Sequence, residues 1–253
     1  MTSDAPGVDV SVVADAAAVA RSGAELFVAA SKKAVAERGR FVVALSGGRT
    51  PAAMYDLLAS DARLRADVPW SQCYFFFGDE RHVPPDHPDS NYRMANEALL
   101  SRLSLNPSQV FRVKAELENA DRAAFEYEEA IRGFFRLTPD QIPRFDLLML
   151  GLGPDGHTAS LFPGTRALQE RVRLVTANWV GQFNAYRITL TVPVLNAAAR
   201  VMFSVQGPDK ARALKAVLHG PYEPWQLPAQ LVQPGNGTVT WLIDRSAGAL
   251  LAA

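Results

Sequence analysis

The chain has 253 residues, and its 26 lysines and arginines balance 26 aspartates and glutamates, so the formal net charge is zero. Apolar residues make up 48% and charged residues 21%, which excludes a disordered or fibrous chain. The lack of a basic excess argues against broad binding to nucleic acid or to an anionic membrane. The length suffices for a sizeable core, and we expect one domain over residues 1–253.

Cys73 is the only cysteine, which excludes an internal disulfide framework and a cysteine-based zinc site. Residues 1–20 have early acids and no basic segment, unlike a secretory signal. No apolar run approaches the roughly 18 residues that cross a bilayer. We therefore expect a cytoplasmic monomer or weak homo-oligomer that binds neither nucleic acid nor membrane.

Strand and helix patterns alternate along the chain. In order, the patterns predict a strand at 8–13, a helix at 14–38, a strand at 41–45, a helix at 51–58, a strand at 74–77, a loop at 78–89, a helix at 90–103 with Ser90 as its N-cap, and a short strand at 110–113. A helix at 120–135, strands at 145–150, 172–177, 187–192 and 201–206, a helix at 208–218, a strand at 239–243 and a small terminal helix follow.

This alternation predicts the α/β class, with a single-domain, largely parallel twisted sheet and helices on both of its faces in a Rossmann-like arrangement. Ligands of such folds bind beyond the carboxyl ends of the strands, where the loops gather. The glycine-rich and charged loops of this chain all follow predicted strands. We therefore searched these loops for chemistry.

The first loop lies between a predicted strand and a predicted helix. Its glycines allow close backbone approach, and free N–H groups at a helix start bind phosphate well. A plain capped turn is the alternative, because no Walker-type lysine follows. The loop consists of Ser46, Gly47, Gly48, Arg49, Thr50 and Pro51.

Lys210 follows Gly207-Pro208-Asp209, again where a strand gives way to a helix. A cation in the first turn of a helix is unfavourable because of the helix dipole, and an anion bound beside Lys210 would stabilise it there. The alternative is a solvated surface lysine.

The loop after the aromatic strand at 74–77 contains Asp79, Glu80, Arg81 and His82. Charged residues at the end of a strand are often functional. Arg81 is suited to clamping a phosphate, and Asp79 to accepting hydrogen bonds from hydroxyl groups. A local ion-pair network is the alternative.

Residues 151–156 contain a literal G-x-G-x-x-G. We do not interpret it as a dinucleotide site, because its strand is not the first of such a unit and the next strand is followed by Asn178 rather than an acid. Asp155-Gly156-His157 is more informative, because an aspartate can fix the tautomer of a nearby histidine. A histidine held in this way can act as a general base, although a structural loop histidine is the alternative.

Arg187 lies on the polar side of a strand that alternates apolar and polar residues, so a solvated arginine and a ligand-binding arginine are both open. The chain has no Gly-x-Ser-x-Gly elbow and no His-Glu-x-x-His motif. We expect no metal.

Taken together in chain order, the loops and motifs described above resemble the 6-phosphogluconolactonase family, in the wider group that includes glucosamine-6-phosphate deaminases. The deaminases have a Glu five residues after the His of Asp-Gly-His, whereas this chain has Phe162 there, which favours hydrolysis. Residues 180–186 depart from the family pattern, because they lack its Lys- and Pro-rich character. The most specific segments are 46–51, 78–81, 83–84, 90–93, 151–164, 187–191 and 207–210.

The resemblance implies a sugar-phosphate isomerase/lactonase type of fold and hydrolysis of 6-phospho-D-glucono-1,5-lactone to 6-phospho-D-gluconate. It implies that His157 takes a proton from water, that Asp155 orients His157, and that Asp79 contacts sugar hydroxyls or the water. No cofactor or metal is needed, because the lactone is already electrophilic. The residues that would bind the substrate and its phosphate are Ser46, Gly47, Gly48, Arg49, Thr50, Arg81, Arg187 and Lys210.

Two other functions remain as alternatives. A phosphosugar isomerase or deaminase would release ammonia from glucosamine 6-phosphate, and Phe162 argues against it. A sugar-phosphate-sensing domain of a transcription regulator would need a DNA-binding segment and a basic surface. The first strand is expected by about residue 8, and the chain has no basic excess.

Overall fold

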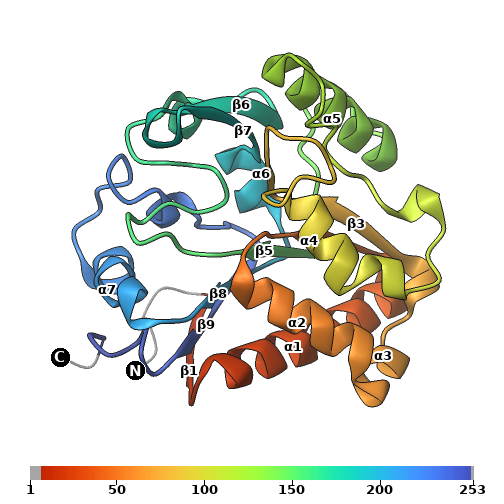
Figure 1. Cartoon of the computed structure of the whole chain (residues 1–253), viewed down its shortest axis with the longest axis horizontal. Coiled ribbons are helices and arrows are strands. Elements are labelled where there is room, and N and C mark those ends of the chain that lie inside the picture. Colours follow the sequence, from red (N-terminus) through yellow and green to blue (C-terminus); the bar gives the residue numbers. More distant parts are fainter. Residues whose placement is uncertain (1–6, 252–253) are drawn as a thin grey trace.

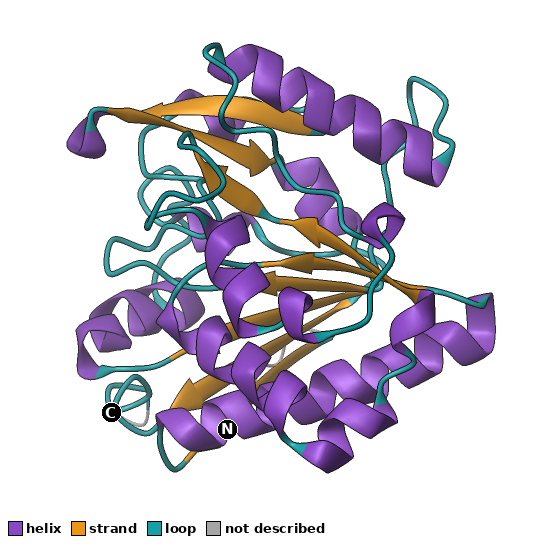
Figure 2. Ribbon diagram, turned by 45° about the vertical axis from the view of Figure 1, so that its right-hand side comes forward, coloured by secondary structure: helices purple, strands orange, loops and turns teal. Residues whose placement is uncertain are grey.

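The computed structural model describes residues 7–251, which form a six-stranded sheet, a three-stranded sheet and surrounding helices (Figures 1 and 2). The strands are β1 (Val8–Val13), β2 (Phe41–Leu45), β3 (Cys73–Phe77), β4 (Asp79–Arg81), β5 (Leu147–Leu150), β6 (Val175–Val180), β7 (Ala185–Leu190), β8 (Arg200–Val205) and β9 (Thr238–Asp244). The α-helices are α1 (Ala16–Arg38), α2 (Arg49–Ser60), α3 (Ala62–Asp67), α4 (Asn91–Ala98), α5 (Ala120–Phe135), α6 (Val192–Ala197) and α7 (Ala211–His219).

The six-stranded sheet has the order β1-β9-β8-β5-β2-β3, and its paired strands are all parallel. This confirms the predicted α/β class with a largely parallel sheet. Side chains of β2 alternate between two apolar clusters, because successive residues of a strand point to opposite faces. Phe41 and Val43 pack with α1 and α2, whereas Val42 and Ala44 pack on the face that also carries α5.

A second sheet, of order β4-β7-β6, is antiparallel and was not foreseen. Figure 1 shows β6 and β7 beside α5, on the opposite side of the main sheet from α1 and α2. Ile188 and Leu190 of β7 are buried in the cluster that includes Phe76 and Phe203 of the main sheet. The small sheet is therefore packed onto the large one.

Gly78 connects the two sheets. Its N–H donates to the carbonyl of Leu45 in β2 (2.8 Å), and its own carbonyl accepts from the N–H of Leu190 in β7 (2.9 Å).

The prediction of an unbroken loop over residues 78–89 is wrong, because residues 79–81 form strand β4. Three residues are too few to show a periodicity, and the two acids in β4 are buried by contacts that the sequence does not reveal.

Local sequence signals explain several helix ends. The side chain of Asp15 accepts from the N–H of Ala18 and caps α1, which ends before Gly39. The predicted N-cap Ser90 accepts from the N–H of Arg93 and starts α4. The predicted continuation to residue 103 is wrong, because the α-helix ends at Ala98 and a short 3-10 turn follows at Leu100–Arg102.

Two further predictions are corrected. Residues 110–113 are not a strand, since Val110 makes only an isolated bridge to Phe75. Residues 245–251 form turns rather than a terminal helix, and residues 252–253 lie outside the described part. Within residues 7–251, no helix has the length and apolar character needed to cross a membrane.

Candidate active site

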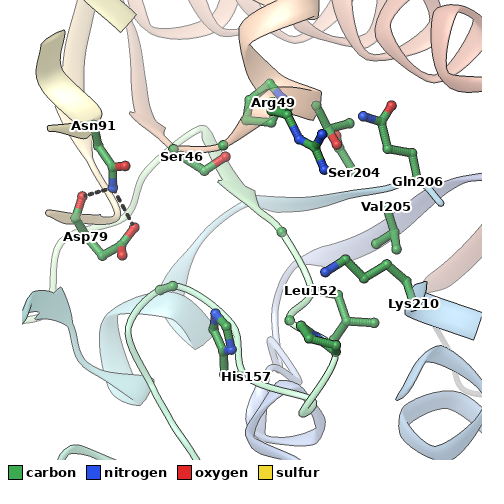
Figure 3. Close-up of a pocket in the computed structure, with 18 of the residues that line it drawn as sticks. Ser46, Arg49, Asp79, Asn91, Leu152, His157, Ser204, Val205, Gln206 and Lys210 are labelled. Atoms are coloured by element: carbon green, nitrogen blue, oxygen red, sulfur yellow. Dashed lines mark hydrogen bonds between the residues drawn. The ribbon is translucent and has the colours of Figure 1, made fainter. Parts of the chain in front are cut away.

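A polar pocket of about 330 Å³ opens where the loops after β2, β5 and β8 meet β4 and α4 (Figure 3). Parallel strands bring their carboxyl ends to one edge of a sheet, which explains why loops far apart in sequence converge here. The pocket is lined by Ser46, Gly47, Gly48, Arg49, Thr50, Pro51, Asp79, Arg81, Asn91, Gly151, Leu152, Gly153, Pro154, His157, Ala159, Ser204, Val205, Gln206, Asp209 and Lys210.

The loop after β2 delivers the start of α2 to this pocket. Gly48 is the N-cap residue with φ of 105°, a left-handed conformation that favours glycine, and no side chain caps the helix. The N–H of Ser46 donates to the hydroxyl of buried Tyr55, which in turn donates to the Ser46 carbonyl (both 3.0 Å). These two hydrogen bonds hold the loop in place on Tyr55. The first N–H groups of α2 have no acceptor within the helix.

Two cationic residues line the same pocket as the start of α2. Arg49 is the first residue of α2, and Lys210 ends the 3-10 turn η6 (Pro208–Lys210) after β8. Lys210 pairs with Asp209 at 3.0 Å, and a hydrogen bond from Lys210 lowers the pKa of this exposed carboxyl. Helix N–H groups together with basic side chains suit a phosphate.

Asp79 lies at the opposite side of the pocket, as Figure 3 shows. Its Oδ2 accepts from the hydroxyl of Ser160 (2.5 Å), and its Oδ1 and backbone carbonyl accept from Nδ2 of Asn91 (3.3 and 3.0 Å). Both carboxylate oxygens therefore have protein donors. This carboxylate is oriented in advance to accept further hydrogen bonds.

Glu80 holds the start of α4 in place rather than facing the pocket. Its side chain, only 2% exposed, accepts from the backbone N–H groups of Arg81, Asn91 and Tyr92 and from the hydroxyl of Ser90. Burial raises the pKa of Glu80, and the backbone hydrogen bonds partly oppose this rise. Through Glu80, β4 and α4 form one unit that carries both Asp79 and Asn91.

Arg81 and Arg187 are direct partners across the β4–β7 ladder. Arg81 lines the pocket and donates to the carbonyl of Asp89, whereas Arg187 lies outside the lining, with its guanidinium 5.2 Å from the ring centre of Phe183. Burial and the positive charge of Arg81 lower the pKa of Arg187. Two neighbouring arginines favour a nearby anion.

The loop after β5 holds an aspartate–histidine pair. Nδ1 of His157 lies 2.5 Å from Oδ1 of Asp155, which also accepts the backbone N–H of His157 (3.1 Å). Burial tends to raise the pKa of Asp155, but the hydrogen bonds and charge of His157 bring the pKa below its ordinary value. A side chain at Gly153 would collide with the imidazole, so this position requires glycine.

The geometry brings together almost all of the predicted site residues. The pocket is lined by residues 46–50, Asp79, Arg81, His157 and Lys210. Asp155 does not line it but contacts Nδ1 of His157. Arg187 is the exception, because it contacts Phe183 instead. Sequence reasoning gave no role to three other polar lining residues, which are Asn91, Ser204 and Gln206.

The signal for these three residues was weak. Asn91 was noted only as part of a segment that resembles the family. Ser204 and Gln206 lie at the carboxyl end of β8, and ligands of parallel sheets bind at this end of the strands. Within residues 7–251, no three His, Cys, Asp or Glu side chains gather closely enough to hold a metal ion.

The fold and the pocket define an α/β protein with a polar, cation-bearing pocket at the carboxyl edge of its parallel sheet and an Asp–His pair beside it. The family model described as "Glucosamine-6-phosphate isomerases/6-phosphogluconolactonase" matches residues 14–241. The chain belongs to this family.

Named relatives agree with this placement. The chain is 39% identical to the 6-phosphogluconolactonase of Nostoc sp. over 96% of this chain and 98% of the relative. It is 41% identical to the 6-phosphogluconolactonase of Homo sapiens over 85% of this chain and 82% of the relative.

Solved structures show the same architecture. The 6-phosphogluconolactonase from Trypanosoma cruzi superposes with a TM-score of 0.84 at 28% identity, over 100% of this chain and 99% of that chain. A monomeric glucosamine-6-phosphate deaminase reaches a TM-score of 0.79 at 20% identity, over 96% of this chain and 99% of that chain, which shows a shared fold alone.

Proposed function

We propose that this chain hydrolyses 6-phospho-D-glucono-1,5-lactone to 6-phospho-D-gluconate, the lactone step of the oxidative pentose phosphate route. Family membership and the named relatives support the lactone hydrolase class. The observation that carries the mechanism is the 2.5 Å contact between Nδ1 of His157 and Asp155. A proton on Nδ1 then leaves the lone pair of Nε2 free to act as a base.

The phosphate binds at the start of α2, where N–H groups, Arg49 and Lys210 converge. Displacement of Asp209 by the phosphate frees Lys210 for this contact. Arg81, with Arg187 opposite it on β7, supplies further positive charge near Asp79. Fixing the phosphate positions the lactone ring, and positioning of this kind accounts for much of the rate gain in such reactions.

In the chemical step, Nε2 of His157 takes a proton from water while the water oxygen bonds to the lactone carbonyl carbon. The carbonyl oxygen becomes an oxyanion, which needs donors such as backbone N–H groups of the glycine loops. When the tetrahedral intermediate collapses, the bond from C1 to the ring oxygen breaks and His157 returns the proton to that oxygen. The products are a carboxylic acid, which ionises, and a free hydroxyl group.

The test measures formation of 6-phosphogluconate, with the spontaneous hydrolysis of the lactone subtracted. His157→Ala is expected to lower kcat by roughly 10²-fold or more, the usual scale for loss of a general base. His219→Ala is the matched control, because His219 is exposed at the end of α7. Near-normal turnover of folded His157→Ala would overturn the general-base role.

A phosphosugar deaminase is the second candidate, because a deaminase shares the fold. Phe162 argues against it, since its ring is stacked on the imidazole of His157 and offers no proton to the substrate. Ammonia release from glucosamine 6-phosphate, without acceleration of lactone hydrolysis, would favour the deaminase. A sensor domain would accelerate neither reaction.

A further inference from the structure

His157 is in contact with more than its aspartate. The ring of Phe162 lies face to face with the imidazole, with ring centres 4.0 Å apart and an angle of 28° between the planes. Phe162 is only 5% exposed, so its ring is held on several sides. One face of the imidazole is thereby covered by a fixed aromatic surface.

Phe162 is itself supported by the small sheet. Phe183 ends the 3-10 turn η5 (Gly181–Phe183) at the tip of the β6–β7 hairpin. Its ring meets that of Phe162 edge to face, with centres 5.7 Å apart and planes at 76°, and the Arg187 guanidinium covers Phe183 in turn. A column of His157, Phe162, Phe183 and Arg187 thus connects the hairpin tip to the imidazole.

The hydrogen bond to Asp155 cannot fix the imidazole alone. The contact at Nδ1 and the close approach of Gly153 hold one edge of the ring but leave its plane free to tilt about that edge. A stacked partner removes this freedom, because turning would separate the two faces. The direction of Nε2, on which the proposed base chemistry depends, is therefore set by Asp155 and Phe162 together.

We propose that Phe162, backed by Phe183, is a positioning residue that holds the His157 imidazole in the plane and tautomer needed to deprotonate water. The proposal rests on the proposed function of His157. It also assigns a role to Phe183, a large apolar side chain that is 52% exposed. The departure of residues 180–186 from the family pattern falls on this same turn.

The test combines kinetics with ¹⁵N NMR of the histidines. Phe162→Leu keeps an apolar side chain but removes the flat face, and Phe183→Leu removes the support. Trp179→Leu is the matched control, since it breaks an aromatic pair with Tyr186 in the same hairpin without touching the column. His157→Gln identifies the His157 signals among those of the four histidines.

For Phe162→Leu we expect kcat to fall by about 3- to 10-fold, the factor that corresponds to loss of one aromatic pair, while KM stays close to wild type. The Nδ1 and Nε2 shifts of His157, which we expect to be distinct in the wild type, should move towards each other as the tautomers mix. Phe183→Leu should act in the same direction with a smaller effect, and Trp179→Leu should change neither quantity.

Wild-type kcat and unchanged nitrogen shifts in a folded Phe162→Leu variant would overturn the proposal. If that variant does not fold, Phe183→Leu decides by the same two readouts, because its side chain is half exposed. Absence of lactone hydrolysis by the wild type would contradict the proposed function instead. The nitrogen shifts would still test the positioning, since they need no substrate.

Discussion

The hydroxyl of Ser160 donates to Oδ2 of Asp79 at 2.5 Å and joins the loop after β5 to strand β4, although the two residues are 81 positions apart in the chain. Asn91 approaches the other carboxylate oxygen, so Asp79 is held from both sides. Because β4 belongs to the small sheet and residue 160 follows β5 of the large sheet, this contact also fixes Asp79 relative to the His157 loop.

Ser160→Ala is expected to raise KM for the lactone. Loss of a hydrogen bond to a charged group costs about 1.5–3 kcal/mol, and a carboxylate with one free oxygen is less well fixed for the sugar hydroxyls. Steady-state kinetics check this prediction, with the exposed Ser101→Ala as control. An unchanged KM would show that Asn91 alone suffices to orient Asp79.

Asp155→Asn is expected to lower kcat by roughly 10²-fold or more, because an amide can present a donor to Nδ1 and favour the wrong tautomer. The variant should also show a pH-dependent loss of stability. The folded-state pKa of Asp155 is lower than its unfolded value, so its ionised form stabilises the fold above the unfolded pKa.

This stabilisation disappears as the pH falls through the folded-state pKa. Denaturant unfolding of wild type and Asp155→Asn should therefore differ most near neutral pH and converge in acid, below the ordinary value of 3.8. A difference that is the same at all pH values would contradict the assigned ionic contact.

Lys210→Ala is expected to raise KM for the phosphorylated lactone by roughly 10- to 100-fold, the scale of a lost charge-assisted contact. Arg187→Ala should have a smaller effect, because Arg187 does not line the pocket. Kinetics on glucono-1,5-lactone, which has no phosphate, provide the control reaction. An equal loss on both lactones would show that these residues are not phosphate ligands.

The thiol of Cys73 should be inert in the folded protein. It is fully buried at the start of β3, and burial raises its pKa to about 12, so little reactive thiolate exists near neutral pH. A disulfide reagent such as dithionitrobenzoate should react only as the chain opens, and the rate should rise with urea. Rapid reaction without denaturant would contradict this burial.

The fold class could be predicted because local signals agree with the global structure. The strands at Val8–Val13 and Phe41–Leu45 have the predicted bounds, since the first alternates valines with polar residues and the second is a compact apolar run. The helix at Ala120–Phe135 was also predicted correctly, and the structure shows that the side chain of Asn119 caps it. Where the sequence offers no such run, as in β4, pairing across the small sheet decides the structure.

The candidate site was predictable where loops follow strands. Asp155, His157 and residues 46–50 carry their own local signal of glycines and charge. Ser204 and the carboxamide of Asn91 do not, because they become pocket residues only when β8 and α4 are packed beside the other loops. The stack of Phe162 on His157 is likewise a tertiary contact, although the two residues are only five positions apart.

Gly78 has a mechanical consequence. Its N–H is bonded to one sheet and its carbonyl to the other, and Asp79 follows directly. A small rotation between the sheets would therefore turn the peptide before Asp79 and move its carboxylate relative to the Asp155–His157 pair, whose loop follows β5 of the large sheet. The distance between Asp79 and the His157 loop thus depends on how rigidly the two sheets pack together, and not on any single loop.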